Sequence, residues 1–138
     1  MNWNDEAEGI MNERFGKDCL LALATQDNGI PWVRTVNAYY WQGSFYIITH
    51  GLSRKMEQIR KNPTVALCGE WFTAHGIGED LGWFCLEKNR EMAEKLEAVF
   101  ASWIHNGHND FQDPNTILLR VKLTDRILLS HGRRFEQP

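Results

Sequence analysis

Residues 48–67 read ITHGLSRKMEQIRKNPTVAL, and this stretch decides the fold. It leads from a β-rich run into a short helix, predicted over Arg54–Lys61, and then into a strand predicted over Thr64–Phe72. Ser53 is a typical N-cap residue, because its hydroxyl can accept a hydrogen bond from a free N–H of the first turn. Asn62-Pro63 ends the helix, since the residue before a proline is disfavoured in helical geometry.

The start of this helix gathers groups that bind an anion. Free backbone N–H groups and the helix dipole favour negative charge there, and the Ser53 hydroxyl can donate to an oxygen atom. Arg54 and Lys55 add full positive charges. A basic helix start that is simply solvated is the alternative, but cations at a helix N-terminus are unfavourable unless an anion accompanies them. We therefore expect an anion, and a phosphate group suits these donors.

The segment before this stretch predicts a helix followed by three antiparallel strands. Apolar residues recur at helical spacing over Asn4–Phe15. Cys19–Thr25 and Pro31–Trp41 are two strand-like runs joined by the turn residues 26–29, which predicts a hairpin. A third strand is predicted over Phe45–Thr49, so this part of the chain forms a β-meander.

The segment after the strand predicted over Thr64–Phe72 is less regular. Thr73–Gly82 is glycine-rich, and we expect the strand to continue through it with a bend or a bulge. Asn89–Ile104 carries one apolar stripe and predicts a helix. Ile117–Leu123 alternates apolar and basic residues as a half-buried strand does, and Ile127–Ser130 predicts a last short strand.

This order of elements predicts one α+β domain, mainly β, over residues 1–138. The sheet is expected to be antiparallel and barrel-like. A hydrophobic fraction of 43% and a charged fraction of 24% are typical of a folded globular protein. The net charge of −3 argues against nucleic acid and anionic membrane as partners, because both attract a basic field. Residues 1–10 do not resemble a signal peptide, and no long apolar run follows, so we expect a cytoplasmic protein.

Cysteine and histidine residues do not predict a disulfide framework or a metal centre. Cys19, Cys68 and Cys85 are odd in number and widely spaced, so we expect reduced, mostly buried thiols. The pair His105 and His108 could begin a zinc site, but no paired cysteines accompany it. Solvent exposure and capping near the predicted helix end explain these histidines, and no metal is expected.

Arg34 is a lone charge inside the strand Pro31–Trp41. Strand alternation places it on the face opposite Val33, Thr35 and Asn37. A charge at this position should face solvent, a partner chain or a ligand. Beside the basic helix start, it could point at the same phosphate.

The runs PWVRTVN and ITHGLSRKMEQIRKNPTVAL together resemble the signature of the pyridoxamine 5'-phosphate oxidase-like superfamily of FMN-binding split barrels. The chain also resembles the small general-stress-protein-like members. The resemblance covers Cys19 to about Gly78 and implies an antiparallel split β-barrel with flanking helices. It further implies a homodimer that holds FMN at the subunit interface.

The resemblance assigns roles to particular residues. The strand residues Arg34, Thr35, Val36 and Asn37 are expected to run along the flavin, with Arg34 reaching its phosphate or ribityl chain. Thr49 is expected to contact the phosphate side or the ring, while Ser53, Arg54 and Lys55 grip the phosphate. Glu70, Trp71 and His75 are expected on the substrate side or at the second subunit.

The chain also departs from the vitamin-processing oxidases of this fold. Their Arg-Gln-Val-type strand and C-terminal Arg-Leu-x-Pro-type segment are replaced here by residues 72–75 and 132–135. A true pyridoxamine phosphate oxidase is therefore not expected. The resemblance implies an FMN-dependent oxidoreductase that acts on a small organic substrate, with NAD(P)H as a candidate electron source. The alternatives are a non-catalytic flavin-binding or redox-responsive protein, and a haem-binding relative of the same fold.

Overall fold

The computed structural model describes residues 2–138. Over these residues the chain forms α-helices, β-strands and one short 3-10 turn. Their bounds in chain order are α1 (Asp5–Phe15), β1 (Cys19–Asp27), β2 (Ile30–Trp41), β3 (Ser44–His50), α2 (Arg54–Lys61), β4 (Thr64–Gly69), β5 (Phe72–Trp83), η1 (Glu87–Asn89), α3 (Arg90–Val99), β6 (Thr116–Ser130) and β7 (Arg133–Gln137).

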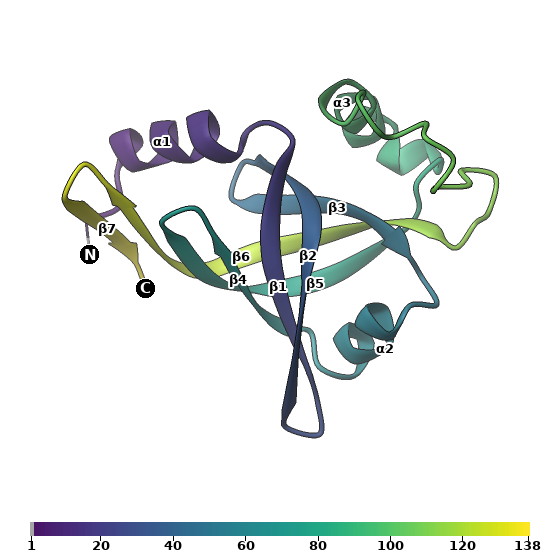
Figure 1. Cartoon of the computed structure of the whole chain (residues 1–138), viewed down its shortest axis with the longest axis horizontal. Helices are drawn as coiled ribbons and strands as arrows, with labels where there is room; N and C mark the ends of the chain where they lie inside the picture. The colour runs from purple at the N-terminus through teal and green to yellow at the C-terminus, as the bar shows by residue number, and fades with distance from the viewer. Residues whose placement is uncertain (1) are drawn as a thin grey trace.

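The sheet closes into an antiparallel barrel (Figure 1). Within residues 2–138 the strand order is β3-β2-β1-β4-β5-β6, and β6 completes the barrel by pairing with β3. β7 pairs with the last part of β6 and extends the sheet beyond the barrel. The predicted α+β, mainly β class and the antiparallel barrel are confirmed.

Local sequence signals place the first two helices and the first hairpins correctly. The side chain of Asn4 caps α1 by accepting from the N–H of Ala7, and α2 has the predicted bounds. The β1–β2 turn is Asn28-Gly29, where both residues have positive φ, at 51° and 83°. This conformation matches the twist of a hairpin and explains why asparagine followed by glycine stands there.

The prediction of one continuous strand from Thr64 through Gly82 is wrong. A turn at Glu70 and Trp71 splits this segment into β4 and β5, which pair with each other. Trp71 has a φ of 51°, a conformation that sequence reasoning does not expect of a tryptophan. The expected irregularity is present inside β5, where the register shifts between His75 and Gly76.

The C-terminal half differs from the prediction in two further ways. α3 ends at Val99, five residues before the predicted end at Ile104, although Phe100 and Ile104 remain buried against the barrel. The two strands predicted between Ile117 and Ser130 are one strand, β6. Thr124, which lies between the two predicted strands, is at a bulge opposite the register shift of β5, so the strand continues past it.

Two of the cysteine predictions need correction. Cys68 and Cys85 are exposed, and Cys19 is half-buried. Cys68 points away from the core because its strand alternates, with Leu67 on the buried face. All three thiols are free, as expected. Burial raises the pKa of the Cys19 thiol to about 12.

The barrel core is organised around an aromatic cluster under α1. The ring of Phe45 lies 5.7 Å from that of Phe15, 6.0 Å from that of Phe72 and 5.3 Å from that of Tyr40. α1 therefore closes one end of the barrel, and α3 covers part of the outer face of the sheet (Figure 1). Over residues 2–138, no helix is long and apolar enough to span a membrane.

Truncating the central ring should destabilise the barrel strongly. Phe45 is fully buried, so Phe45→Ala is expected to lower the free energy of unfolding by about 3–5 kcal/mol. Ile30→Ala, at an exposed position of the first hairpin, is the control and should change it by about 0.5 kcal/mol or less. Urea unfolding measures both, and equal effects of the two substitutions would contradict the assigned core.

Candidate anion-binding site

The site begins where β2 and β3 part. Their ladder joins Tyr39–Trp41 to Ser44–Tyr46, and β3 then pairs with β6 as far as His50. If the β2–β3 ladder continued in register, Val36 would face Thr49. The two strands diverge instead, and Figure 1 shows α2 below the point of divergence. Strand edges there are free to accept a ligand.

α2 presents its N-terminus to this opening. Ser53 caps the helix by accepting a hydrogen bond from the N–H of Met56, at 3.3 Å. A hydroxyl that accepts in a cap still carries a proton that it can donate. The guanidinium of Arg54 lies 4.7 Å from the ring centre of Trp32 on β2, so this exposed side chain bridges from helix to strand.

Lys55 turns inward from the first turn of α2. Its ammonium donates to the hydroxyl of Thr49, at 2.6 Å. Burial, and then the nearby positive charge of Arg34, lower the pKa of Lys55 to about 8. Both causes disfavour the protonated form of Lys55. The positive charges of Arg34 and Lys55 are therefore close together without a neutralising group among the described residues.

Arg34 is held at the same place by neutral acceptors. Its guanidinium donates to the hydroxyl of Thr25 at 2.7 Å, to the carbonyl of Leu23 at 3.2 Å and to Oε1 of Gln58 at 3.3 Å. Burial lowers the pKa of Arg34 from its usual value. No ion pair within residues 2–138 includes Arg34, Arg54 or Lys55.

A cavity of about 390 Å³ adjoins these groups. It is lined by Asp27, Trp32, Arg54, Glu57, Gln58 and Lys61. Two of these lining residues, Asp27 and Glu57, carry carboxylates, and the neutral amide of Gln58 is buried. Clustered cations, a helix N-terminus and an amide donor together suit a compact oxyanion such as a phosphate monoester.

The other strand residues expected at the flavin point in different directions. Val36 is buried in the barrel core and Thr35 is exposed on the outer face of the sheet. The Asn37 amide donates to Asp18 at 3.1 Å, and Asp18 also accepts from the indole of Trp103. In this chain these three residues can therefore border the opening with their backbone, while Arg34 contributes its side chain.

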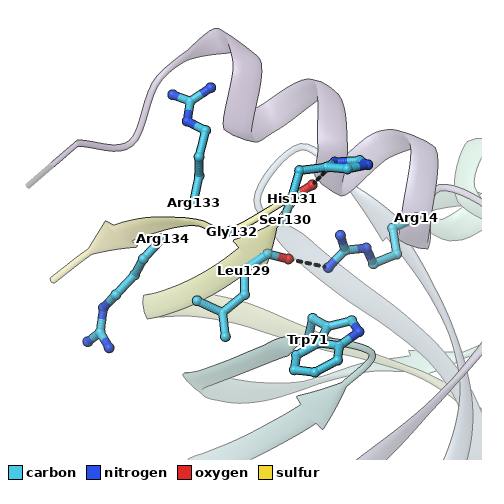
Figure 2. A pocket seen from close by; sticks show the side chains of 8 residues that line it. All are labelled: Arg14, Trp71, Leu129, Ser130, His131, Gly132, Arg133 and Arg134. Atoms are coloured by element: carbon cyan, nitrogen blue, oxygen red, sulfur yellow. Dashed lines mark hydrogen bonds between the residues drawn. The ribbon is translucent and has the colours of Figure 1, made fainter.

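Glu70, Trp71 and His75 lie away from this site. Glu70 and Trp71 form the β4–β5 turn, which Figure 1 shows on the opposite side of the barrel from α2. Trp71 is 68% exposed and lines a cavity of about 520 Å³ with Arg14 and Leu129, shown in Figure 2. His75 is on the outer face of β5, where its ring lies 2.9 Å from Asp125.

The histidine pair considered as a metal site has other partners. His105 lies 2.7 Å from the carboxylate of Glu97, and its ring packs against Phe111. His108 is exposed in the loop that follows. Among the described residues, no group of three or more histidine, cysteine, aspartate and glutamate side chains could hold a metal ion.

Sequence reasoning missed Thr25 and Gln58. Thr25 follows Leu21 and Leu23 in the two-residue alternation of β1, so its inward direction could have been read from the sequence. Gln58 lies three residues after Lys55 on the same face of the helix. The signal that identifies Gln58 is a polar residue at a helix position that faces the core.

Solved structures with the same fold support the resemblance. General stress protein 26 from Bacillus anthracis superposes with a TM-score of 0.70 at 15% identity, over 94% of this chain and 98% of that chain. A FAD-binding protein from Mesorhizobium loti gives 0.69 at 15% identity, over 91% and 94%. A proposed pyridoxamine 5'-phosphate oxidase from Listeria innocua gives 0.65 at 15% identity, over 88% and 94%.

These similarities establish the fold. No family model matches the chain, and no curated protein matches it either. At identities this low, the shared feature is the split-barrel architecture. The resemblance to the pyridoxamine 5'-phosphate oxidase-like split barrels is confirmed at that level.

Anion affinity should fall as the pH rises through the pKa of Lys55, about 8. A bound anion stabilises the protonated amine, so the free protein must take up a proton to bind once the amine is neutral. A phosphate monoester has its second pKa at about 6, so its charge is constant from about pH 7.5 to about pH 9.5. Over this interval we expect the affinity for a simple monoester to fall about tenfold by calorimetry.

The control for this measurement is Lys55→Arg. An arginine keeps its charge throughout the interval, so the affinity of this variant should not depend on pH. A wild-type profile as flat as that of the variant would show that Lys55 does not contact the anion.

Proposed function

We propose that the chain is a flavoprotein that binds FMN through its phosphate at the N-terminus of α2. The observation that carries this proposal is the pair of half-buried cations, Arg34 and Lys55, which within residues 2–138 have neutral partners and no carboxylate. The fold supports it, since one structural neighbour is a FAD-binding protein. A single compact anion site favours the monoester of FMN over a longer diphosphate.

The rest of the cofactor would extend into the opening between β2 and β3. From a phosphate at Ser53, Arg54 and Lys55, the ribityl chain would pass along the diverging edges of β2 and β3. Thr49 is buried at that border and presents its hydroxyl to Lys55. In this arrangement Arg34 holds the phosphate end, and the backbone of residues 35–37 lies beside the flavin.

The proposed activity is an oxidoreductase reaction on a small organic molecule. When bound, FMN supplies hydride and electron transfer, so the chain needs no acid–base pair of its own for that chemistry. The protein binds the cofactor, orients it and limits access of water. NAD(P)H is the proposed electron donor. Turnover with an added acceptor separates this proposal from a flavin-binding protein without catalysis.

A second copy of the chain is the proposed partner. Across β2, β1, β4 and β5, one outward-facing row is formed by Val33, Ala24, Ala66 and His75, which are paired in register. Val33 is 70% exposed, and a solvated sheet face is normally polar. Pairing of two such faces would bury the apolar side chains of Val33, Ala24 and Ala66.

The homodimer also gives a role to residues that one chain keeps apart. Glu70 and Trp71 are on the opposite side of the barrel from α2, so they cannot join the phosphate site of their own chain. We propose that they approach the ring side of the flavin held by the second subunit, together with His75. The exposed Trp71 ring and the cavity of Figure 2 are suited to a planar molecule.

Removing the two helix-start cations should weaken FMN binding strongly. Arg54→Ala combined with Lys55→Ala is expected to weaken FMN at least about a hundredfold, because two charge-assisted contacts to the phosphate are lost. The thermal midpoint of the cofactor-free protein should not fall, since neither charge has a carboxylate partner within residues 2–138.

Flavin fluorescence titration measures this effect, with two controls. Riboflavin lacks the phosphate, so its weaker affinity should be the same in wild type and variant. Lys88→Ala combined with Arg90→Ala removes the same charge from exposed positions just before and at the start of α3 and should leave FMN affinity unchanged. Equal FMN affinity in the two double variants would overturn the phosphate site.

A charge at the centre of the apolar row should break the proposed dimer. Ala24→Arg is expected to shift the protein from dimer to monomer in sedimentation velocity, because a long charged side chain at the centre of the row would hold the two faces apart, and burying its charge is unfavourable. Ser102→Arg, an exposed position after α3, is the matched control and should remain dimeric. A dimer that survives Ala24→Arg would place the interface elsewhere.

A further inference from the structure

Gln58 is a polar residue in an apolar position of α2. Its side chain is 3% exposed, and its neighbours Met56 and Ile59 are buried in the barrel core. Burying a primary amide is unfavourable unless its oxygen and both its N–H groups find partners. A leucine would pack in this position without that cost, so the amide requires an explanation.

The oxygen atom of the amide accepts two hydrogen bonds. Oε1 of Gln58 accepts from Nη2 of Arg34, at 3.3 Å, and from the hydroxyl of Thr25. Thr25 in turn accepts from Nη1 of the same guanidinium at 2.7 Å. Arg34 is therefore fixed from two sides by neutral groups, and its charge remains available to a ligand.

The nitrogen atom of the amide is unsatisfied. Nε2 of Gln58 is buried and has no hydrogen-bond partner among the described residues. Gln58 also lines the cavity beside Arg54. A buried donor next to clustered cations requires an acceptor. An oxyanion supplies an acceptor oxygen and also a negative charge that balances the cations.

We propose that Gln58 is a positioning and specificity residue of the phosphate site. Its Oε1 holds Arg34 in place, and its Nε2 donates to an oxygen of the bound phosphate. This inference rests on the proposed function in one respect, since FMN is taken as the source of the phosphate. A neutral amide is needed here because a carboxylate would neutralise Arg34, and a third cation would repel it.

The test compares Gln58→Glu with Gln58→Met in cofactor-free protein. Glutamate has nearly the same shape, and its carboxylate would pair with Arg34 and occupy the anion site. We expect Gln58→Glu to raise the thermal midpoint and to weaken FMN about a hundredfold, while riboflavin affinity stays the same. Gln58→Met, which packs but cannot hydrogen-bond, should also reduce the preference for FMN over riboflavin.

The ratio of FMN to riboflavin affinity distinguishes this role from a structural one. A merely structural Gln58 would affect both flavins equally and would lower the thermal midpoint in both variants. Gln112→Glu, in the exposed loop before β6, adds the same charge elsewhere and should change neither quantity. An unchanged affinity ratio in both Gln58 variants would overturn the inference and leave the proposed function intact.

Inorganic phosphate separates the two proposals. Suppose that wild type does not bind FMN, but phosphate raises its thermal midpoint and fails to raise that of Gln58→Glu. Then FMN is the wrong ligand, and the role of Gln58 in anion binding stands. Failure of wild type to respond to either FMN or phosphate would overturn both.

Discussion

The architecture depends on how the barrel closes. β3 leaves β2 after a short ladder and completes the barrel through β6. This divergence exposes the edges of two strands at one place, and the connection from β3 leads into α2 (Figure 1). The N-terminus of α2 and the inward face of β2 are thereby brought together. If β2 and β3 were paired along their whole length, no room would remain for a ligand between them.

The charges at this place oppose folding and favour binding. Burial lowers the pKa of both Arg34 and Lys55, and the positive charge of Arg34 lowers the pKa of Lys55 further. The folded protein tolerates them because Thr25, Thr49 and Gln58 provide neutral hydrogen-bond partners. A site arranged in this way is least stable when it is empty, which is typical of residues selected for binding rather than for stability. Bound phosphate would relieve the repulsion.

Much of this arrangement could be predicted from local sequence signals. The features that depend on contacts between residues far apart in the sequence could not. The helix cap at Ser53 and the direction of Arg34 follow from neighbouring residues, so sequence reasoning placed both. The turn at Trp71 was missed because its positive φ is imposed by pairing of β4 with β5 and falls on a tryptophan rather than on a glycine. Gln58 was missed because its function depends on Arg34, which lies on another element. The prediction of two strands in place of β6 was wrong because a bulge accommodates residues that usually form turns.

The central claim is that a flavin phosphate neutralises the cations at the start of α2. The most direct measurement is the visible absorption spectrum of the freshly purified protein, followed by heat release and chromatography of the chromophore against FMN, FAD and haem standards. The account predicts a flavin spectrum and release of FMN at about one per chain. A colourless protein that takes up no added FMN, or a chromophore identified as haem, would contradict it.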